Sequence, residues 1–145
     1  MNSLDVYGIC NPLIDLLSHV PEPFLGERGL EKDRMYLVEL EQQQSILIAL
    51  AAQNLPIESA PGGSGANTMI GIAQLGGQTA FTGKVGQDKH GDSYRDGLEA
   101  QGVKSCLGTG LGTTGSSLIL VAPDAARTMN THLGMCQQLE VADID

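Results

Sequence analysis

The stretch PGGSGANTMIGIAQLGG, residues 61–77, reads as a glycine turn that opens a helix. A short extended segment, PIESAP, precedes it, and a β-rich segment, QTAFTGKVG, follows it. Apolar residues recur in it at helical spacing, and a Gly-Gly pair is expected to stop the helix. The helix is predicted to present one apolar face, made of Met69, Ile72, Ala73 and Leu75. A strand–helix–strand order of this kind is typical of α/β proteins with a parallel sheet.

The same alternation continues outward from this stretch. Helices are predicted over residues 39–53 and 88–102, with Gly102 ending the second one. Strands are predicted at residues 4–10, 78–86, 103–108, 115–122 and 126–132. Residues 16–40 are expected to form a short strand, a Pro-bounded turn, one helical turn and a second short strand at MYLV. Hairpin-like strands near both ends predict a small antiparallel piece beside the parallel sheet.

Composition limits the class of protein. A chain of 145 residues with 41% hydrophobic residues suits one globular domain. Seventeen acidic and eight basic residues give a net charge of −9, which disfavours nucleic acid or an anionic membrane as the partner. The longest apolar run, 46–52, is too short to span a bilayer, and no basic leader segment is present. We therefore expect a cytoplasmic protein whose three cysteines are reduced and mostly buried.

The glycine loop fits neither common phosphate motif. A Walker loop ends in Gly-Lys-Ser/Thr, and no lysine follows these glycines; a dinucleotide fingerprint needs a third glycine where Thr68 stands. An amide on the first helical turn, Asn67, suits a sugar hydroxyl, because it donates and accepts at once. Asp15, expected in a loop after the first strand, is predicted to face the same crevice. The alternatives are a plain Gly-Gly turn, a helix-capping Asn67 and an ordinary loop carboxylate.

Longer stretches carry a family resemblance. The series Pro61-Gly62-Gly63-Ser64-Gly65-Ala66-Asn67, then Gly76, then Gly83-Lys84-Val85-Gly86-Gln87-Asp88-Lys89-His90-Gly91, resembles the N-terminal signature of the ribokinase-like carbohydrate kinases, the PfkB family. Met69 departs from it, because a small residue is usual there. Residues 8–15, GICNPLID, are similar to the adenosine kinase branch, and residues 114–116 and 127–134 are similar to lid and strand segments of its bacterial members.

The resemblance implies a fold, an activity and a set of residues. The fold would be a ribokinase-like three-layer α/β sheet with a small β lid. Residues 1–145 would form the N-terminal part of this domain, incomplete on the C-terminal side, with lid strands from about 16–38 and 115–131. The activity would be ATP-dependent phosphorylation of a sugar or nucleoside hydroxyl. Met129 is either a base or sugar contact or a core residue. The substrate-binding residues implied are Asp15, Gly62, Gly63, Asn67, Asn11 and Met129.

The family's second signature, Asp-Thr-x-Gly-Ala-Gly-Asp, does not occur in the sequence. Because that motif supplies the anion hole and the catalytic base, no catalytic or metal-binding residue is expected here. Sites for ATP and Mg²⁺ are expected outside this chain, which would then be inactive alone. Two other interpretations stay open: a non-enzymatic sugar or nucleoside binding module, and a fragment that folds with a partner chain. Dimerisation through lid strands, or association through an incomplete sheet, is a further expectation.

Overall fold

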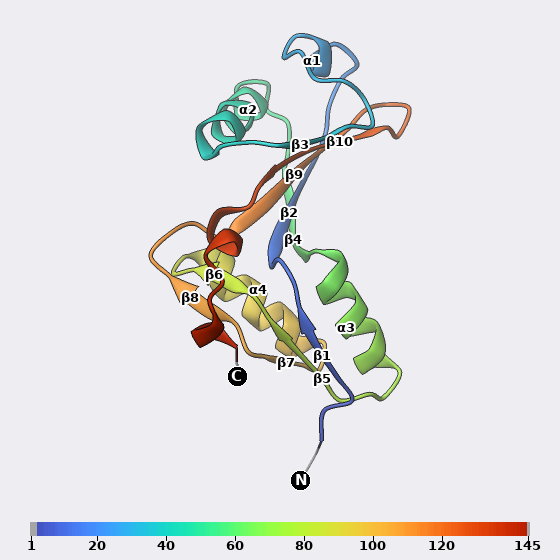
Figure 1. Ribbon diagram of the computed structural model, residues 1–145. Coiled ribbons are helices and arrows are strands. Elements are labelled where there is room, and N and C mark those ends of the chain that lie inside the picture. Colours follow the sequence, from blue (N-terminus) through green and yellow to red (C-terminus); the bar gives the residue numbers. More distant parts are fainter. Residues whose placement is uncertain (1–2, 145) are drawn as a thin grey trace. The chain divides into compact units, whose positions relative to one another are not determined.

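The computed structural model describes residues 3–144 and divides the chain into two compact units (Figure 1). Unit 1 holds the residues up to Ile14, Pro61–Gly115 and the residues from Leu133 onward. Unit 2 holds Asp15–Ala60 and Ser116–His132. None of the helices within 3–144 has the length and apolar character needed to cross a membrane.

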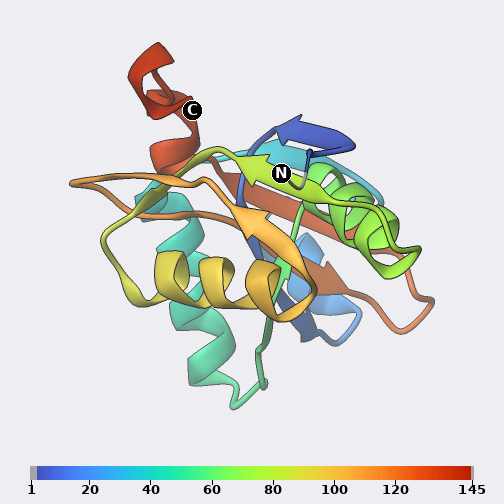
Figure 2. The same cartoon turned by 90° about the horizontal axis from the view of Figure 1, so that it is seen from below.

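Unit 1 is built on a parallel sheet whose strands lie in the order β1-β5-β7 (Figure 2). A second small sheet pairs β6 with β8, also in parallel. The strands of unit 1 are β1 (Val6–Ile9), β5 (Thr79–Thr82), β6 (Lys84–Gly86), β7 (Val103–Ser105) and β8 (Gly108–Gly110). Its helices are α3 (Ser64–Gln74) and α4 (Lys89–Ala100), with 3₁₀ turns at Gly134–Gln138 and Val141–Asp143.

Helices α3 and α4 cover the same face of this sheet. The Thr79 hydroxyl donates to the backbone oxygen of Met69 in α3 at 3.3 Å. The Phe81 ring lies 6.1 Å from the Tyr94 ring of α4, measured between centroids. Because alternate residues of a strand point to one side, Thr79 and Phe81 place both helices on that side. All four of these residues are buried, so this face holds the core of unit 1.

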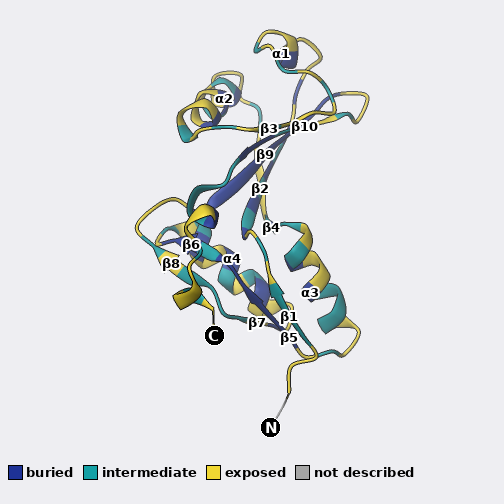
Figure 3. Cartoon of the chain, viewed as in Figure 1, coloured by how far each residue is buried: buried dark blue, intermediate teal, exposed yellow. Residues whose placement is uncertain are grey.

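Unit 2 contains most of a five-stranded sheet in the order β3-β10-β9-β2-β4. Strand β10 runs antiparallel to β9 and parallel to β3. Figure 3 shows β9 buried along its length. The strands are β2 (Leu13–His19), β3 (Met35–Leu37), β4 (Glu58–Gly62), β9 (Gly115–Val121) and β10 (Arg127–His132), and the helices are α1 (Pro23–Gly26) and α2 (Leu40–Ala52).

A buried glutamine fixes α2 on one side of this sheet. Gln43 is 2% exposed, and its Nε2 donates to the backbone oxygens of Ser116 at 3.2 Å and Asn130 at 2.9 Å. Its Oε1 accepts from the Ser116 hydroxyl at 2.8 Å. The Ser116 side chain therefore points to α2, and alternation with the β9–β10 register puts Asn130 on the same side. We call it the α2 side; Ile119 and Met129 point to the opposite side, which we call the Asp15 side.

The predicted fold class is confirmed: the chain is a ribokinase-like α/β fold with parallel and antiparallel parts, incomplete relative to its full-length structural neighbours. The predicted helices and most strands are present within two or three residues at each end. Gly102 follows the last turn of α4 with φ +80°, as predicted for a helix-ending glycine.

Three local predictions were wrong. The single strand expected at 78–86 is two strands in different sheets, because Gly83 packs against the Cys10 carbonyl and Pro12 where the chain changes sheet. Strand β8 falls mostly in the gap between the strands expected at 103–108 and 115–122, where no strand was predicted. Leu75, expected on the apolar face of α3, is the C-cap residue after Gln74 and is 90% exposed; the chain turns at the next residue, Gly76, with φ +96°.

The cysteine prediction is correct in part. All three cysteines are free, but only Cys136 is buried, whereas Cys10 and Cys106 are half-buried. Burial raises the pKa of Cys136 to about 11. Its Sγ lies 3.5 Å from the backbone oxygen of Pro12, so the thiol donates a weak hydrogen bond inside unit 1.

Candidate functional site

Asp15 lies in strand β2 and not in the loop predicted for it. Pro12 ends the first extended segment, and from Leu13 onward residues alternate between half-buried and buried, as in a strand with two different sides. The carboxylate therefore projects from the middle of a sheet rather than from the end of β1. The argument from a shared edge of parallel strands does not apply to it, since β1 and β2 belong to different sheets.

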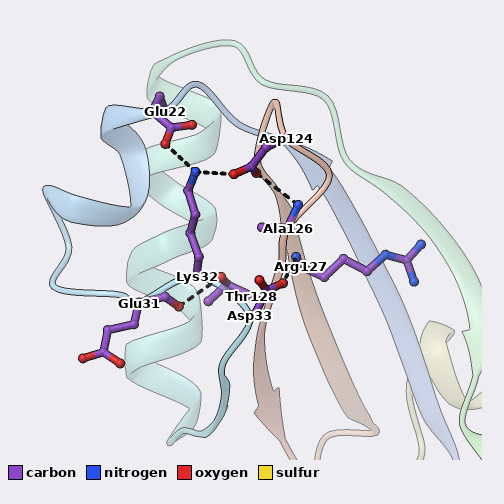
Figure 4. A network of polar contacts seen from close by, with 8 residues as sticks. All are labelled: Glu22, Glu31, Lys32, Asp33, Asp124, Ala126, Arg127 and Thr128. Carbon is purple, nitrogen blue, oxygen red and sulfur yellow. Dashed lines mark hydrogen bonds and ion pairs between the residues drawn. The ribbon is translucent and has the colours of Figure 1, made fainter.

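Asp15 lines a hollow of about 260 Å³ within unit 2. Strands β2, β4, β9 and β10 all contribute to its wall, and Glu58 and Arg127 supply charge beside Asp15. Figure 4 shows the Arg127 side chain extending away from Lys32 and Asp33, which lie near its backbone. The wall residues are Asp15, Leu17, Glu58, Ser59, Ala60, Ile119 and Arg127.

The Asp15 carboxyl is poised for an external partner. Partial burial raises its pKa above the usual 3.8, and the positive charge of Arg127 opposes that rise. Across residues 3–144 it accepts no hydrogen bond and forms no ion pair. A carboxylate kept from water without a partner is destabilising unless something else donates to it. Two free oxygens suit two neighbouring hydroxyl groups.

Apolar side chains stand beside this carboxylate. Leu17 and Ile119 share its hollow, and Met129 is the cross-strand partner of Ile119. On the sheet edge, Met35 pairs with Met129 and is 56% exposed. The Asp15 side thus offers a polar group next to a surface that a flat apolar ring can cover. Met129 is half-buried here, so it is a surface contact as well as a packing residue.

The glycine loop lies in unit 1, between β4 and α3. Gly63 is the residue before α3 and adopts φ +96°, a conformation that favours glycine. A Cβ on Gly63 would lie 3.1 Å from the backbone oxygen of Asn11, so these two predicted site residues are neighbours. Gly62 is buried, and its carbonyl accepts a hydrogen bond from the Tyr94 hydroxyl at 2.8 Å. The loop is therefore anchored from α4.

Asn67 occupies the first turn of α3 with an exposed side chain. Its backbone N–H donates to Gly63 O at 3.1 Å, and its side chain makes no hydrogen bond to any residue in 3–144. The amide therefore does not cap the helix, which was one alternative. Asn67, Gly62, Gly63 and Asn11 are brought together in unit 1. Asp15 and Met129 share one side of the unit 2 sheet, and convergence of the two groups stays a prediction.

The glycines of the long signature pack the backbone of unit 1. A Cβ on Gly65 would lie 2.5 Å from Cys10 Cβ, and one on Gly91 would clash with the Gly86 carbonyl.

Asp88 caps α4 by accepting a hydrogen bond from the Gly91 N–H at 2.8 Å, and it also accepts from the Thr114 N–H at 2.8 Å and from the Thr114 hydroxyl at 2.6 Å. Burial acts to raise the pKa of Asp88, but these hydrogen bonds outweigh it and hold the pKa below 3.8.

Comparison with known proteins agrees with this geometry. The family described as pfkB family carbohydrate kinase matches residues 35–144, which include the glycine loop and Met129. The chain belongs to the pfkB family of carbohydrate kinases.

Solved structures of kinases resemble this pfkB family member over its whole length. An adenosine kinase from Sinorhizobium meliloti superposes with a TM-score of 0.81 and 34% identity, covering 98% of this chain and 43% of its own. A probable sugar kinase from Rhizobium etli gives a TM-score of 0.83 and 34% identity, covering 100% of this chain and 43% of its own. The ribokinase of Bacillus subtilis is 42% identical over 48 residues, 33% of this chain and 16% of that protein. The chain thus spans less than half the length of these relatives.

Neither a metal ion nor an ATP phosphate is assigned to the described residues of this pfkB chain. Within 3–144, no three His, Cys, Asp or Glu residues gather as a metal site would require. Lys84, in the signature, is held in a nearly buried ion pair with Asp143 at 2.8 Å. No step of phosphoryl transfer is therefore assigned to these residues.

Arg127 is a charged residue of the hollow that was not predicted from the sequence as a site residue. The available signal was alternation: Arg127 is two residues from Met129 in one strand, so both side chains must lie on the same side of the sheet. The sequence could not predict that Arg127 lies near Asp15, because this depends on the placement of β2 and β10 on either side of β9.

Proposed function

We propose that this chain forms the substrate-binding part of a pfkB kinase that phosphorylates a hydroxyl group of adenosine or a closely related nucleoside. The observation that carries the proposal is the Asp15 carboxylate, which is half-buried in a hollow of about 260 Å³ and accepts no hydrogen bond from residues 3–144. A ribose offers two adjacent hydroxyls, which donate to the two carboxylate oxygens and offset the cost of their burial.

The rest of the predicted set takes positioning roles. Asn67 donates to and accepts from another sugar hydroxyl with its free amide. Gly62, Gly63 and Asn11 form the backbone floor on which the sugar rests. That these residues and Asp15 bind one and the same substrate is part of the proposal.

A nucleoside is favoured over a free sugar by the apolar surface beside Asp15. Met129, Ile119 and Met35 offer a flexible, polarisable area that suits the face of a purine. The similar structures include an adenosine kinase that is 34% identical over 98% of this chain, which makes adenosine the first nucleoside to test. ATP, bound by groups outside the described residues, supplies the transferred phosphoryl group in this family, and the residues here hold and orient the acceptor.

Calorimetric titration of the purified chain with adenosine, ribose and fructose tests the proposal. Asp15→Asn keeps the shape of the side chain but removes its charge, and Asp96→Asn is the matched control on the exposed face of α4. Loss of a charge-assisted hydrogen bond is expected to weaken adenosine binding by about tenfold or more, whereas the control binds as the parent does.

The other outcomes have defined meanings. Equal adenosine affinity of the Asp15→Asn variant and the parent would contradict the assigned role of Asp15. Tighter binding of fructose than of adenosine would point to a sugar kinase. A non-enzymatic binding module would be favoured if the chain binds adenosine and a longer protein that contains this chain together with an ATP-binding segment shows no turnover.

A further inference from the structure

A second and larger cavity lies on the α2 side of the unit 2 sheet. Its volume is about 380 Å³, and helix α2, strand β3 and the segment Arg28–Leu30 form its walls. It is distinct from the Asp15 hollow, because Asn130 lines it from β10, whereas Arg127 of the same strand lines the other. A cavity of about 150 Å³ is large enough to bind benzene, so this cavity has room for a small ring as well as for water.

Asn130 forms the polar base of the cavity. The residue is 0% exposed, and within residues 3–144 neither its amide nitrogen nor its amide oxygen has a hydrogen-bond partner. Its backbone lies in the β10 ladder, and its backbone oxygen also accepts from Gln43 Nε2 at 2.9 Å. Buried amides are almost always satisfied, since leaving one unpaired is costly. Asn130 thus holds an unpaired donor and an unpaired acceptor side by side in the wall of the cavity.

The other uncharged polar side chains of the wall each bond to one protein group within residues 3–144. The Tyr36 hydroxyl accepts from the Glu31 N–H at 3.0 Å, and the Ser45 hydroxyl donates to the Gln42 carbonyl at 2.7 Å. Gln42 Oε1 accepts from the Glu39 N–H at 3.0 Å. Because these groups bond to the protein, Asn130 dominates the polar specificity of the cavity.

The charge at the wall is also balanced. Arg28 stacks on the Phe24 ring at 3.7 Å, donates to the Phe24 carbonyl at 2.9 Å and pairs with Glu27 at 3.4 Å. The remaining wall is apolar, from Leu30 and Ile46 among others. A neutral occupant therefore fits better than an ionised one.

The wall is held in place by the contacts drawn in Figure 4. Lys32 bridges Glu22 and Asp124, the latter at 2.7 Å, and so links the segment after α1 to the β9–β10 turn. The Thr128 hydroxyl donates to the Glu31 carbonyl at 3.2 Å, and the Arg127 N–H donates to Asp33 at 3.1 Å. These bonds fix the segment that follows Arg28–Leu30 against β10, so the cavity exists before anything binds.

We propose that this cavity is a second binding site for a small, flat, neutral molecule that presents a hydrogen-bond donor next to an acceptor, as a carboxamide or nucleobase edge does. The edge pairs with both amide atoms of Asn130, in the way an asparagine pairs with the edge of adenine. The ring packs between the apolar side chains of Leu30 and Ile46.

Ligand-observed NMR with the purified chain tests this site, with benzamide and adenine as probes. Methyl benzoate has the shape of benzamide but lacks the donor, so it serves as the matched probe. Asn130→Leu removes the amide edge, and Ser45→Phe blocks the cavity from the exposed surface of α2 without changing Asn130. Gln44→Leu, on the exposed face of the same helix, is the control variant.

Benzamide and adenine are expected to bind the parent and the control, and methyl benzoate at least about tenfold more weakly. Both cavity variants are expected to lose binding of the amide probes by about tenfold or more. Equal binding to the Asn130→Leu variant and the parent would overturn the proposal. So would the absence of binding by either amide probe, in which case the cavity holds water alone.

Discussion

Gln43 provides the sharpest test of how unit 2 is held together. Residues 42–44 are three consecutive glutamines, yet only the middle one is buried. The Gln43 side chain makes three hydrogen bonds, joining α2 to β9 and β10. Replacing Gln43 with Leu keeps the approximate volume and removes all three. In the variant, the Ser116 and Asn130 carbonyls and the Ser116 hydroxyl lose this partner while they stay buried.

The expected loss follows from those three bonds. At about 1 kcal/mol net for each bond, the substitution costs about 3 kcal/mol of unfolding free energy. A chain of 145 residues has an unfolding entropy of about 0.3 kcal/mol per K near its melting temperature, so the melting temperature falls by about 10 °C. Gln44→Leu changes an exposed residue of the same type in the same helix, and its effect is expected within about 0.5 kcal/mol.

Thermal unfolding followed by circular dichroism measures both variants under one set of conditions. A melting temperature of the Gln43→Leu variant within about 2 °C of the Gln44→Leu variant would refute the reasoning. That result would mean that the hydrogen bonds of Gln43 are replaced by water in the variant, or that α2 does not depend on them.

Three further predictions concern titrating groups. Because burial raises the pKa of Asp15, adenosine affinity is expected to fall as the pH is lowered, starting above the usual carboxyl range. Titration calorimetry between pH 7 and 4 measures this, and an affinity that does not change with pH would argue against a charged Asp15 at the sugar. Asp88→Asn is expected to lower the melting temperature by several degrees at neutral pH. Because the folded pKa of Asp88 is depressed, its contribution to stability is present above pH 3.8 and is lost as the pH falls through the folded pKa, so the difference in melting temperature between variant and parent must narrow in acid. Cys136 has a raised folded pKa of about 11, so the stability that it contributes below its unfolded pKa near 9.0 is lost as the pH rises toward 11. At pH 8, iodoacetamide is expected to modify Cys10 and Cys106 first, and early alkylation of Cys136 would show that it is not buried.

The elements of this fold were largely predictable from local patterns. Helices α2, α3 and α4 followed from apolar spacing and from glycines at their ends, since both signals act over one or two turns. The exchange of sheets at Gly83 was not predictable, because it depends on the approach of Cys10 and Pro12, about 70 residues earlier in the chain. The same holds for β8, whose pairing with β6 spans a whole helix.

The candidate site divides in the same way. The glycine loop with Asn67 was recognisable in sequence, because a left-handed Gly63 and the first turn of a helix are local features. Asp15 was identified as a carboxylate of interest but placed in a loop. Its position in the middle of β2 depends on which strands flank it.

By itself, the sequence determined the helices, most of the strands, the family, and the residue types available for binding a hydroxyl-rich molecule. Tertiary structure alone decided which of three adjacent glutamines is buried, that Arg127 stands beside Asp15, and that Asn130 lines a cavity with both amide atoms unpaired among residues 3–144. The physical reason is that backbone periodicity and glycine conformation are local properties. Burial and the pairing of polar groups, in contrast, depend on strands that come together only when distant parts of the chain fold into one sheet.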